Sequence, residues 1–297
     1  MRGFDTIVMA DWSARSAPSP RRPVADAIWI AVAAQGQETV TYYRTRARAE
    51  AQLTALLAEG RATGRRVLLG LDFAFGYPAG FAAALTGTGR AQAVWAWLAA
   101  HLHDGPDNAN TRFAVADAIN ARFPGVGPFW GCPPGLSLPH LPARGRLRQG
   151  HGMTERRLAE QAVPRAHPVW KLFTTGAVGS QVLVGLPMLH RLAERFGTDL
   201  AIWPFDRPDA PLVAAEIYPA LIDPMLPMAP DAIRDAAQVR LMARAMGRLQ
   251  AAGMLDRAFT TPDDTRITEE GWILGASCSQ ELRALLSRTS PSPGPTA

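Results

Sequence analysis

The sequence is poor in cysteine, in lysine and in long apolar runs, and each shortage narrows the classes of protein it can belong to. Its 297 residues include two cysteines, Cys132 and Cys278, whose separation fits neither a zinc motif nor a disulfide framework. Apolar stretches are interrupted well before the roughly 20 residues that a membrane-spanning helix needs. Residues 1–5 show no charged region followed by an apolar one, so no secretory signal is predicted. We therefore expect a reduced, cytoplasmic protein with no membrane partner.

The positive charge of the chain comes almost entirely from arginine. Lys171 is the only lysine, the net charge is +5 and the isoelectric point is about 9.8. Such a balance permits a polyanionic partner, and arginine suits bidentate contacts with phosphate. An arginine- and alanine-rich composition can equally reflect a genome-wide bias, so the charge by itself leaves the partner open.

Three short apolar runs each end on an acidic residue. Continuous apolar runs of this length are typical of buried strands, and a carboxylate at the end of a buried strand is costly unless its charge is compensated. Three such carboxylates suggest one shared site, with a shared metal ion as the simplest compensation. The runs and their acids are 6–10 with Asp11, 67–71 with Asp72, and 212–215 with Glu216.

The predicted elements follow the order three strands, helix, strand, long insertion, strand, helix. The first three strands are closely spaced and predict an antiparallel meander. One domain over 1–288 and a disordered Pro- and Ser-rich tail over 289–297 are expected. The predicted strands cover 4–11, 27–33, 39–43, 66–72 and 212–218, and the helices that flank the insertion cover 47–60 and 231–252.

The insertion, about 76–205, alternates helix-like pieces around 90–103 and 186–196 with Gly- and Pro-rich stretches. A connection this long inside a domain is typically an ordered insertion or a lid. We expect it to cover the carboxyl ends of the strands.

Five short blocks strengthen this interpretation: 10–13 (ADWS), 69–78 (LGLDFAFGYP), 178–187 (VGSQVLVGLP), 215–220 (AEIYPA) and 270–275 (EGWILG). Together they resemble a bacterial and archaeal family of predicted ribonuclease H-like nucleases, known as domain of unknown function 429. The last helix of that family often carries an Asp-x-x-Asp-Ala-like pattern. The corresponding stretch here departs from it, with Asp231 one turn before Asp235 and Ala236.

The resemblance implies an α/β fold of the ribonuclease H type. Its mixed five-stranded sheet would have the order 3-2-1-4-5, with helices on both faces and the insertion between strands four and five. Asp11, Asp72, Glu216 and Asp235 would form the catalytic and metal-binding cluster. One or two Mg²⁺ or Mn²⁺ ions held there would support phosphodiester hydrolysis on nucleic acid or another phosphate-bearing substrate.

Each acid also has a plain structural interpretation. Asp11 and Asp72 can act as capping or turn residues, and Glu216 can pair with an arginine of the insertion. Asp235 is in the first turn of a predicted helix, where the helix dipole favours an acid.

A dense group of cations in segment 140–171 is the best candidate for a phosphate-binding surface, because only Glu155 and Glu160 oppose it. A solvated loop is the alternative. The predicted phosphate-binding residues are Arg144, Arg146, Arg148, Arg156, Arg157 and Lys171.

Two other functions stay open. A non-catalytic binding module would not bind metal. A nucleotide-binding protein linked to molybdopterin guanine dinucleotide synthesis, a label that some relatives carry, would bind a pterin or a guanine nucleotide. An actin-like ATPase is disfavoured, because the turn after Asp11 holds the bulky Trp12 where a phosphate loop needs glycine.

Overall fold

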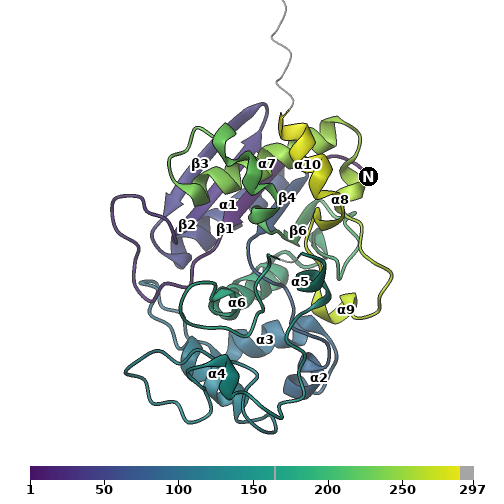
Figure 1. Cartoon of the computed structure of the whole chain (residues 1–297). Coiled ribbons are helices and arrows are strands. Elements are labelled where there is room, and N and C mark those ends of the chain that lie inside the picture. The colour runs from purple at the N-terminus through teal and green to yellow at the C-terminus, as the bar shows by residue number, and fades with distance from the viewer. Residues whose placement is uncertain (164, 288–297) are drawn as a thin grey trace, which may run out of the picture.

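Six strands form one mixed sheet in the computed structural model, which describes residues 1–163 and 165–287 (Figure 1). The strands are β1 (Thr6–Asp11), β2 (Ile28–Ala34), β3 (Gln37–Tyr43), β4 (Val67–Leu71), β5 (Leu200–Trp203) and β6 (Leu212–Glu216). Their order is β3-β2-β1-β4-β6-β5. β1, β2 and β3 form the expected antiparallel meander. β1, β4, β6 and β5 run parallel to one another. The central strands β4 and β6 are buried along their whole length, as continuous apolar runs predict.

The prediction of five strands was wrong in number. The predicted fifth strand is β6, which lies next to β4 as expected. β5 adds a sixth strand on the far side of β6, inside the region that the sequence assigned to the insertion. It was missed because it is only four residues long and ends at Trp203, directly before Pro204. The α/β class and the mixed sheet are confirmed.

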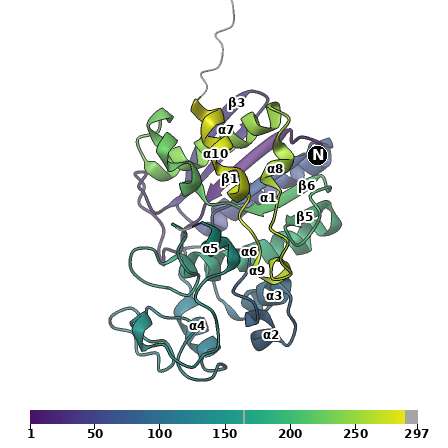
Figure 2. The ribbon, with the colours of Figure 1, turned by 45° about the vertical axis from the view of Figure 1, so that its right-hand side comes forward.

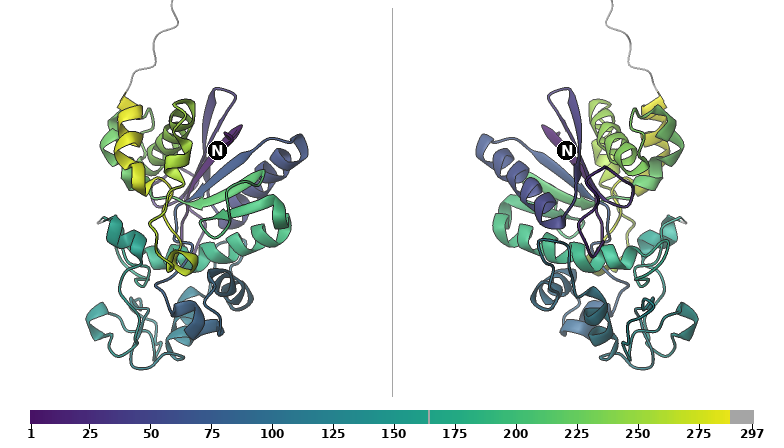
Figure 3. Two further views of the ribbon diagram at one scale, coloured as in Figure 1. Left: turned by 90° about the vertical axis from the view of Figure 1, so that its right-hand side faces the viewer. Right: turned by 90° about the vertical axis from the view of Figure 1, so that its left-hand side faces the viewer.

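Helices cover both faces of the sheet, as predicted (Figure 3). On one face α1 (Arg46–Thr63) and α6 (Val178–Phe196) pack in the same core as Val8, Leu69 and other strand residues. On the other face α7 (Arg234–Ala251) and α10 (Ser279–Ser287) pack with Met9 and its neighbours. Strand side chains alternate between the two cores, because successive residues of a strand point to opposite faces.

The insertion gathers at the end of the sheet where β1 and β4 finish (Figures 1 and 2). It shares a core cluster with the sheet and with α1, so its helices are packed onto the strands. Gln181, on the first turn of α6, donates a 2.6 Å hydrogen bond to the carbonyl oxygen of Trp12, just past β1. Part of the insertion therefore lies over the carboxyl end of β1, as expected. Its helices before α6 are α2 (Phe81–Thr86), α3 (Ala91–His101), α4 (Arg112–Asn120) and α5 (Leu158–Ala162).

Short helices complete the described chain, and the predicted tail, 289–297, lies outside the described residues. Across 1–163 and 165–287, every helix is too short or too polar to cross a bilayer. The remaining helices are η1 (Gly145–Leu147), η2 (Gly197–Asp199), η3 (Pro219–Met228), α8 (Leu255–Ala258), α9 (Ile267–Glu270) and η4 (Ala276–Cys278).

The loop after β4 packs closely against α9, and this contact yields a stability prediction. A Cβ added at Gly76 would overlap the carbonyl oxygen of Glu269 and lie 2.7 Å from the carbonyl carbon of Glu270. Backbone atoms cannot yield as a flexible side chain does, so Gly76→Ala should lower the free energy of unfolding by about 2 kcal/mol in urea denaturation. Gly89→Ala is the control, because its new methyl would meet no atom within 4 Å. Equal stability of the two variants would contradict this packing.

Candidate active site

The parallel pairing of β1 with β4 places Asp11 beside Asp72. Asp11 is the last residue of β1, and Asp72 directly follows β4. The backbone N–H of Asp72 donates to the carbonyl oxygen of Ala10 at 3.0 Å, which continues the ladder past Leu71. Both side chains line one groove at this edge of the sheet. The predicted neighbourhood of these two acids is therefore present.

Asp235 reaches the same place from a third element. It lies in the first turn of α7, which packs against β1 and β2. Its Oδ2 accepts a 2.7 Å hydrogen bond from the backbone N–H of Asp26, a residue with positive φ (+54°). Asp11, Asp72 and Asp235 line one groove of about 680 Å³. The loop 172–178 of the insertion also lines this groove.

Burial raises the pKa of all three acids. It raises the pKa of Asp11 well above its ordinary value, and the charges of Asp72 and Asp235 act in the same direction. Burial, together with the charges of Glu216 and Asp235, raises the pKa of Asp72 to about 7. The pKa of Asp235 is also raised, because burial outweighs the hydrogen bond from Asp26 and the charge of Arg234. The site therefore favours a proton or another cation on these carboxyl groups.

Glu216 has the alternative role considered from the sequence, an ion pair with an arginine of the insertion. Both of its oxygens accept hydrogen bonds from Arg157, at 2.7 and 2.9 Å, and the N–H of Phe75 donates to the same carboxylate at 3.1 Å. Nε of Arg157 also donates to Glu160 at 2.7 Å. All three charged side chains are buried. Glu216 is thus paired with Arg157 and does not line the groove of the three aspartates. It does share a smaller cavity with Asp72, and its charge raises the pKa of Asp72.

Metal binding fits the groove best as a two-carboxylate site. Within residues 1–163 and 165–287, no three histidine, cysteine or acidic side chains lie close enough together to hold a metal ion on their own. Mg²⁺ is usually bound by one or two carboxylates, with water and substrate phosphate completing its shell. The adjacent pair Asp11 and Asp72 supplies that donor set, and Asp235 contributes a third charge to the groove.

The predicted phosphate-binding residues do not gather in this groove, and none of the six lines it. Arg157 is buried, and four of its donor contacts go to Glu160, Glu216 and the carbonyl oxygen of Glu270, so the structure gives it an ion-pairing role. Its burial could not be read from a sequence in which arginines are dense.

The other five members of that set have three different environments. Arg144 and Arg146 are exposed around η1. Arg148 and Lys171 both lie over the ring of Trp130, and Arg148 pairs with the carboxylate of Glu155 at 2.7 Å. Arg156 donates to the carbonyl oxygens of Glu160 and Ala166.

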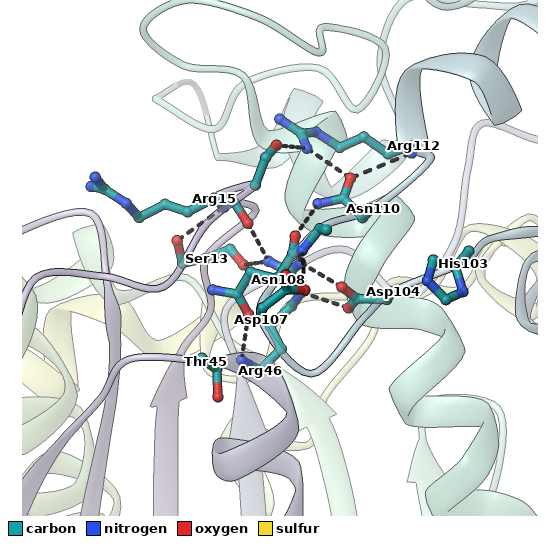
Figure 4. Close-up of polar contacts among 12 residues, drawn as sticks. Ser13, Arg15, Thr45, Arg46, His103, Asp104, Asp107, Asn108, Asn110 and Arg112 are labelled. Carbon is teal, nitrogen blue, oxygen red and sulfur yellow. Dashed lines mark hydrogen bonds and ion pairs between the residues drawn. The ribbon is translucent and has the colours of Figure 1, made fainter.

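Sequence reasoning missed three residues that line the groove with the acids: Arg15, Arg112 and Phe173. Arg15 extends from the turn after β1, and Arg112 lies at the start of α4 (Figure 4). Phe173 lies on the loop before α6. Nothing in their local pattern separates them from the other arginines and aromatics of the insertion, because their position depends on how the insertion folds back.

Comparison with protein-family models, with curated proteins and with solved structures yields no match for this chain, so its site is interpreted from its own geometry.

The buried ion pairs of Arg157 give a first prediction for this region. Arg157→Gln leaves Glu216 and Glu160 buried without a counter-charge, which should lower the free energy of unfolding by about 3–5 kcal/mol in urea denaturation. Arg191→Gln is the matched control, because Arg191 pairs with Glu50 at 2.7 Å with its side chain 48% exposed. It should cost less than about 1 kcal/mol. A similar loss in both variants would argue against a buried network.

The pKa of Asp72 gives a second prediction, for metal-free protein in EDTA. The folded state keeps a proton to about pH 7 that the unfolded chain releases near its ordinary pKa of 3.8. Stability of the parent should therefore fall as the pH rises through this window, and Asp72→Asn should gain stability relative to the parent across it. Asp263→Asn, at an exposed loop position, should differ in stability from the parent by the same amount at every pH. Urea denaturation at several pH values measures the stability of both variants. If the difference between Asp72→Asn and the parent does not change with pH, the pKa of Asp72 is not raised.

Proposed function

We propose that the groove is the active site of a metal-dependent phosphodiester hydrolase of the ribonuclease H-like type. One observation carries the proposal: Asp11, Asp72 and Asp235 converge on one groove from three elements, and no cation of the described residues forms an ion pair with any of them. Buried carboxylates are normally paired. A cation supplied from outside the chain fits this imbalance.

Asp11 and Asp72 would hold a Mg²⁺ or Mn²⁺ ion, which supplies charge neutralisation and a bound water of lowered pKa for attack on phosphorus. Asp11 is fixed by the β1 ladder and Asp72 by its backbone bond to Ala10, so both are rigidly placed. Asp235, held by the N–H of Asp26, adds a carboxylate that can accept a proton from a water in the groove.

Two arginines that line the groove support a phosphate-bearing substrate. Arg15 and Arg112 bring positive charge to the same groove, as a substrate phosphate requires. Arg144 and Arg146, which are exposed on the insertion, remain available for phosphates farther along a strand.

The test incubates purified protein and Mn²⁺ with labelled single-stranded, double-stranded and branched DNA and RNA. We expect cleavage of at least one substrate, and Asp11→Asn and Asp72→Asn should each reduce the rate by about 100-fold or more. Both variants should still bind the substrate, because these acids hold metal. Asp263→Asn, on an exposed loop, should cleave like the parent.

A second readout follows the metal itself. Mn²⁺ should raise the melting temperature of the parent and of Asp263→Asn, and should raise that of Asp72→Asn less, since a ligand that binds the folded state stabilises it. If no substrate is cut and Mn²⁺ leaves the melting temperature of the parent unchanged, the hydrolase proposal fails. A non-catalytic nucleotide-binding protein would then be the better description.

A further inference from the structure

Arg112 is a buried cation on the wall of the groove. It is only 8% exposed. Its Nε donates to Oγ of Ser180 at 2.9 Å, and Nη1 donates to Oγ of Ser16 at 2.8 Å and to Oδ1 of Asn110 at 2.7 Å (Figure 4). Within the described residues no carboxylate lies at ion-pair distance from it, and its Nη2 donates no hydrogen bond. The face of the guanidinium packs 4.2 Å from the ring centre of Phe113.

Other buried arginines show how unusual this arrangement is. Arg46 pairs with Asp104 at 2.6 Å, and Arg157 pairs with Glu160 and Glu216. Arg66 has no carboxylate at ion-pair distance in the described chain, but all three of its guanidinium nitrogens donate to carbonyl oxygens. A buried charge is stable when it is paired and fully hydrogen bonded. Arg112 thus has no counter-charge within the described residues, and its Nη2 group, which is not fully buried, is free to donate to a ligand.

Burial and the charge of Arg46 together lower the pKa of Arg112 to about 10. The guanidinium is therefore still a cation at neutral pH. Because Arg112 lines an open groove, an anion in that groove can supply the missing partner.

The surroundings of Arg112 are held rigidly by Arg46. Nη1 of Arg46 donates to the carbonyl oxygens of Ser13 and Arg15, and Nη2 donates to the carbonyl oxygen of Asn108 (Figure 4). Asn110 in turn donates to the same Asn108 carbonyl at 2.8 Å. The turn after β1 and the loop before α4 are thus joined around one buried guanidinium. This network fixes the donors of the groove before any ligand arrives.

Phe173 lies on the rim of the same groove with 39% of its surface exposed. Among the described residues it is the only aromatic side chain in the group of exposed large apolar residues. Its loop is closed by Nζ of Lys171, which donates to the carbonyl oxygen of Thr175 at 2.5 Å. Oγ of Ser180 donates to the carbonyl oxygen of Leu172 at 2.6 Å and accepts from Arg112. One hydroxyl therefore links the backbone next to Phe173 with the guanidinium of Arg112.

We infer that Arg112 and Phe173 form a subsite for one unpaired nucleotide of a single strand, in which Arg112 binds a phosphate and Phe173 stacks on the base. Arg15, exposed at the rim, adds a second phosphate contact. A groove of about 680 Å³ is of the size that small-ligand sites have. A base within a duplex is already stacked and paired, so an aromatic platform selects a single strand. The inference rests on the proposed function for its location next to the acids.

The test measures binding in EDTA, without metal, by fluorescence anisotropy. One probe is a labelled single-stranded oligothymidylate of about eight nucleotides, a length typical of such sites. The second is an abasic deoxyribose-phosphate strand of equal length. Phe173→Ala should weaken oligothymidylate binding by about 10-fold and leave abasic binding unchanged, because base stacking alone is lost. Phe173→Trp should restore it.

The arginine variants should change binding in a different way. Arg112→Gln and Arg15→Gln should weaken the binding of both probes and reduce the salt dependence of the affinity, since a phosphate contact is lost. Leu147→Ala and Arg195→Gln, at exposed positions outside the groove, should bind like the parent. If Arg112→Gln unfolds, the Phe173 and Arg15 variants decide, because neither side chain is buried.

The subsite is overturned if Phe173→Ala and Arg15→Gln bind both probes like the parent, or if a hairpin duplex of equal length binds as well as the single strand. These readouts need no metal and no cleavage. The protein can therefore bind in this pattern without cleaving any substrate, or cleave a substrate without this binding pattern, and the two assays distinguish these results.

Discussion

The buried guanidinium of Arg157 holds together the parts of the chain on which the site depends. It bonds to Glu216 at the end of β6, to Glu160 in α5 and to the backbone of α9 at Glu270. The side chain of Glu270 then accepts from the N–H groups of Ala79 and Leu158, which ties in the loop after β4. Removing one partner from such a network leaves buried charges that no water can reach. The insertion is fixed to the sheet by this chemistry as well as by apolar packing.

The same network determines which acids at this edge of the sheet lack a counter-charge. Once Glu216 is neutralised, the uncompensated charge at this edge of the sheet is that of Asp11, Asp72 and Asp235. The same groove is lined by Arg112, a cation without a carboxylate partner in the described chain. Charges of both signs therefore line one open groove without forming ion pairs with each other. A metal ion at the acids and a phosphate at Arg112 would satisfy both.

The clustered acids and the unpaired Arg112 both reduce the stability of the fold when metal and substrate are absent. Adjacent buried carboxylates repel each other, and a largely buried guanidinium without a counter-charge has a desolvation cost that no ion pair offsets. Proteins keep such uncompensated charges mainly at functional sites, where the ligand completes the set. Both kinds of uncompensated charge line one groove here, whereas Arg46 and Arg157 form ion pairs and Arg66 donates from all three guanidinium nitrogens. That coincidence supports the interpretation of the groove as a site.

The sequence by itself determined the strands β1 to β4 and β6, their meander and parallel neighbours, and the adjacency of Asp11 and Asp72. These follow from local apolar runs and short connections, which leave few alternative pairings. Only the tertiary structure decided the pairing of Glu216 with Arg157, the place of β5, and the presence of Arg112 and Phe173 in the groove. Each of these depends on the path of the insertion, about 76–205, whose segments meet the sheet through contacts far apart in the chain. Local periodicity carries no information on such contacts, because an arginine that is buried in an ion pair and one that faces solvent have the same sequence pattern.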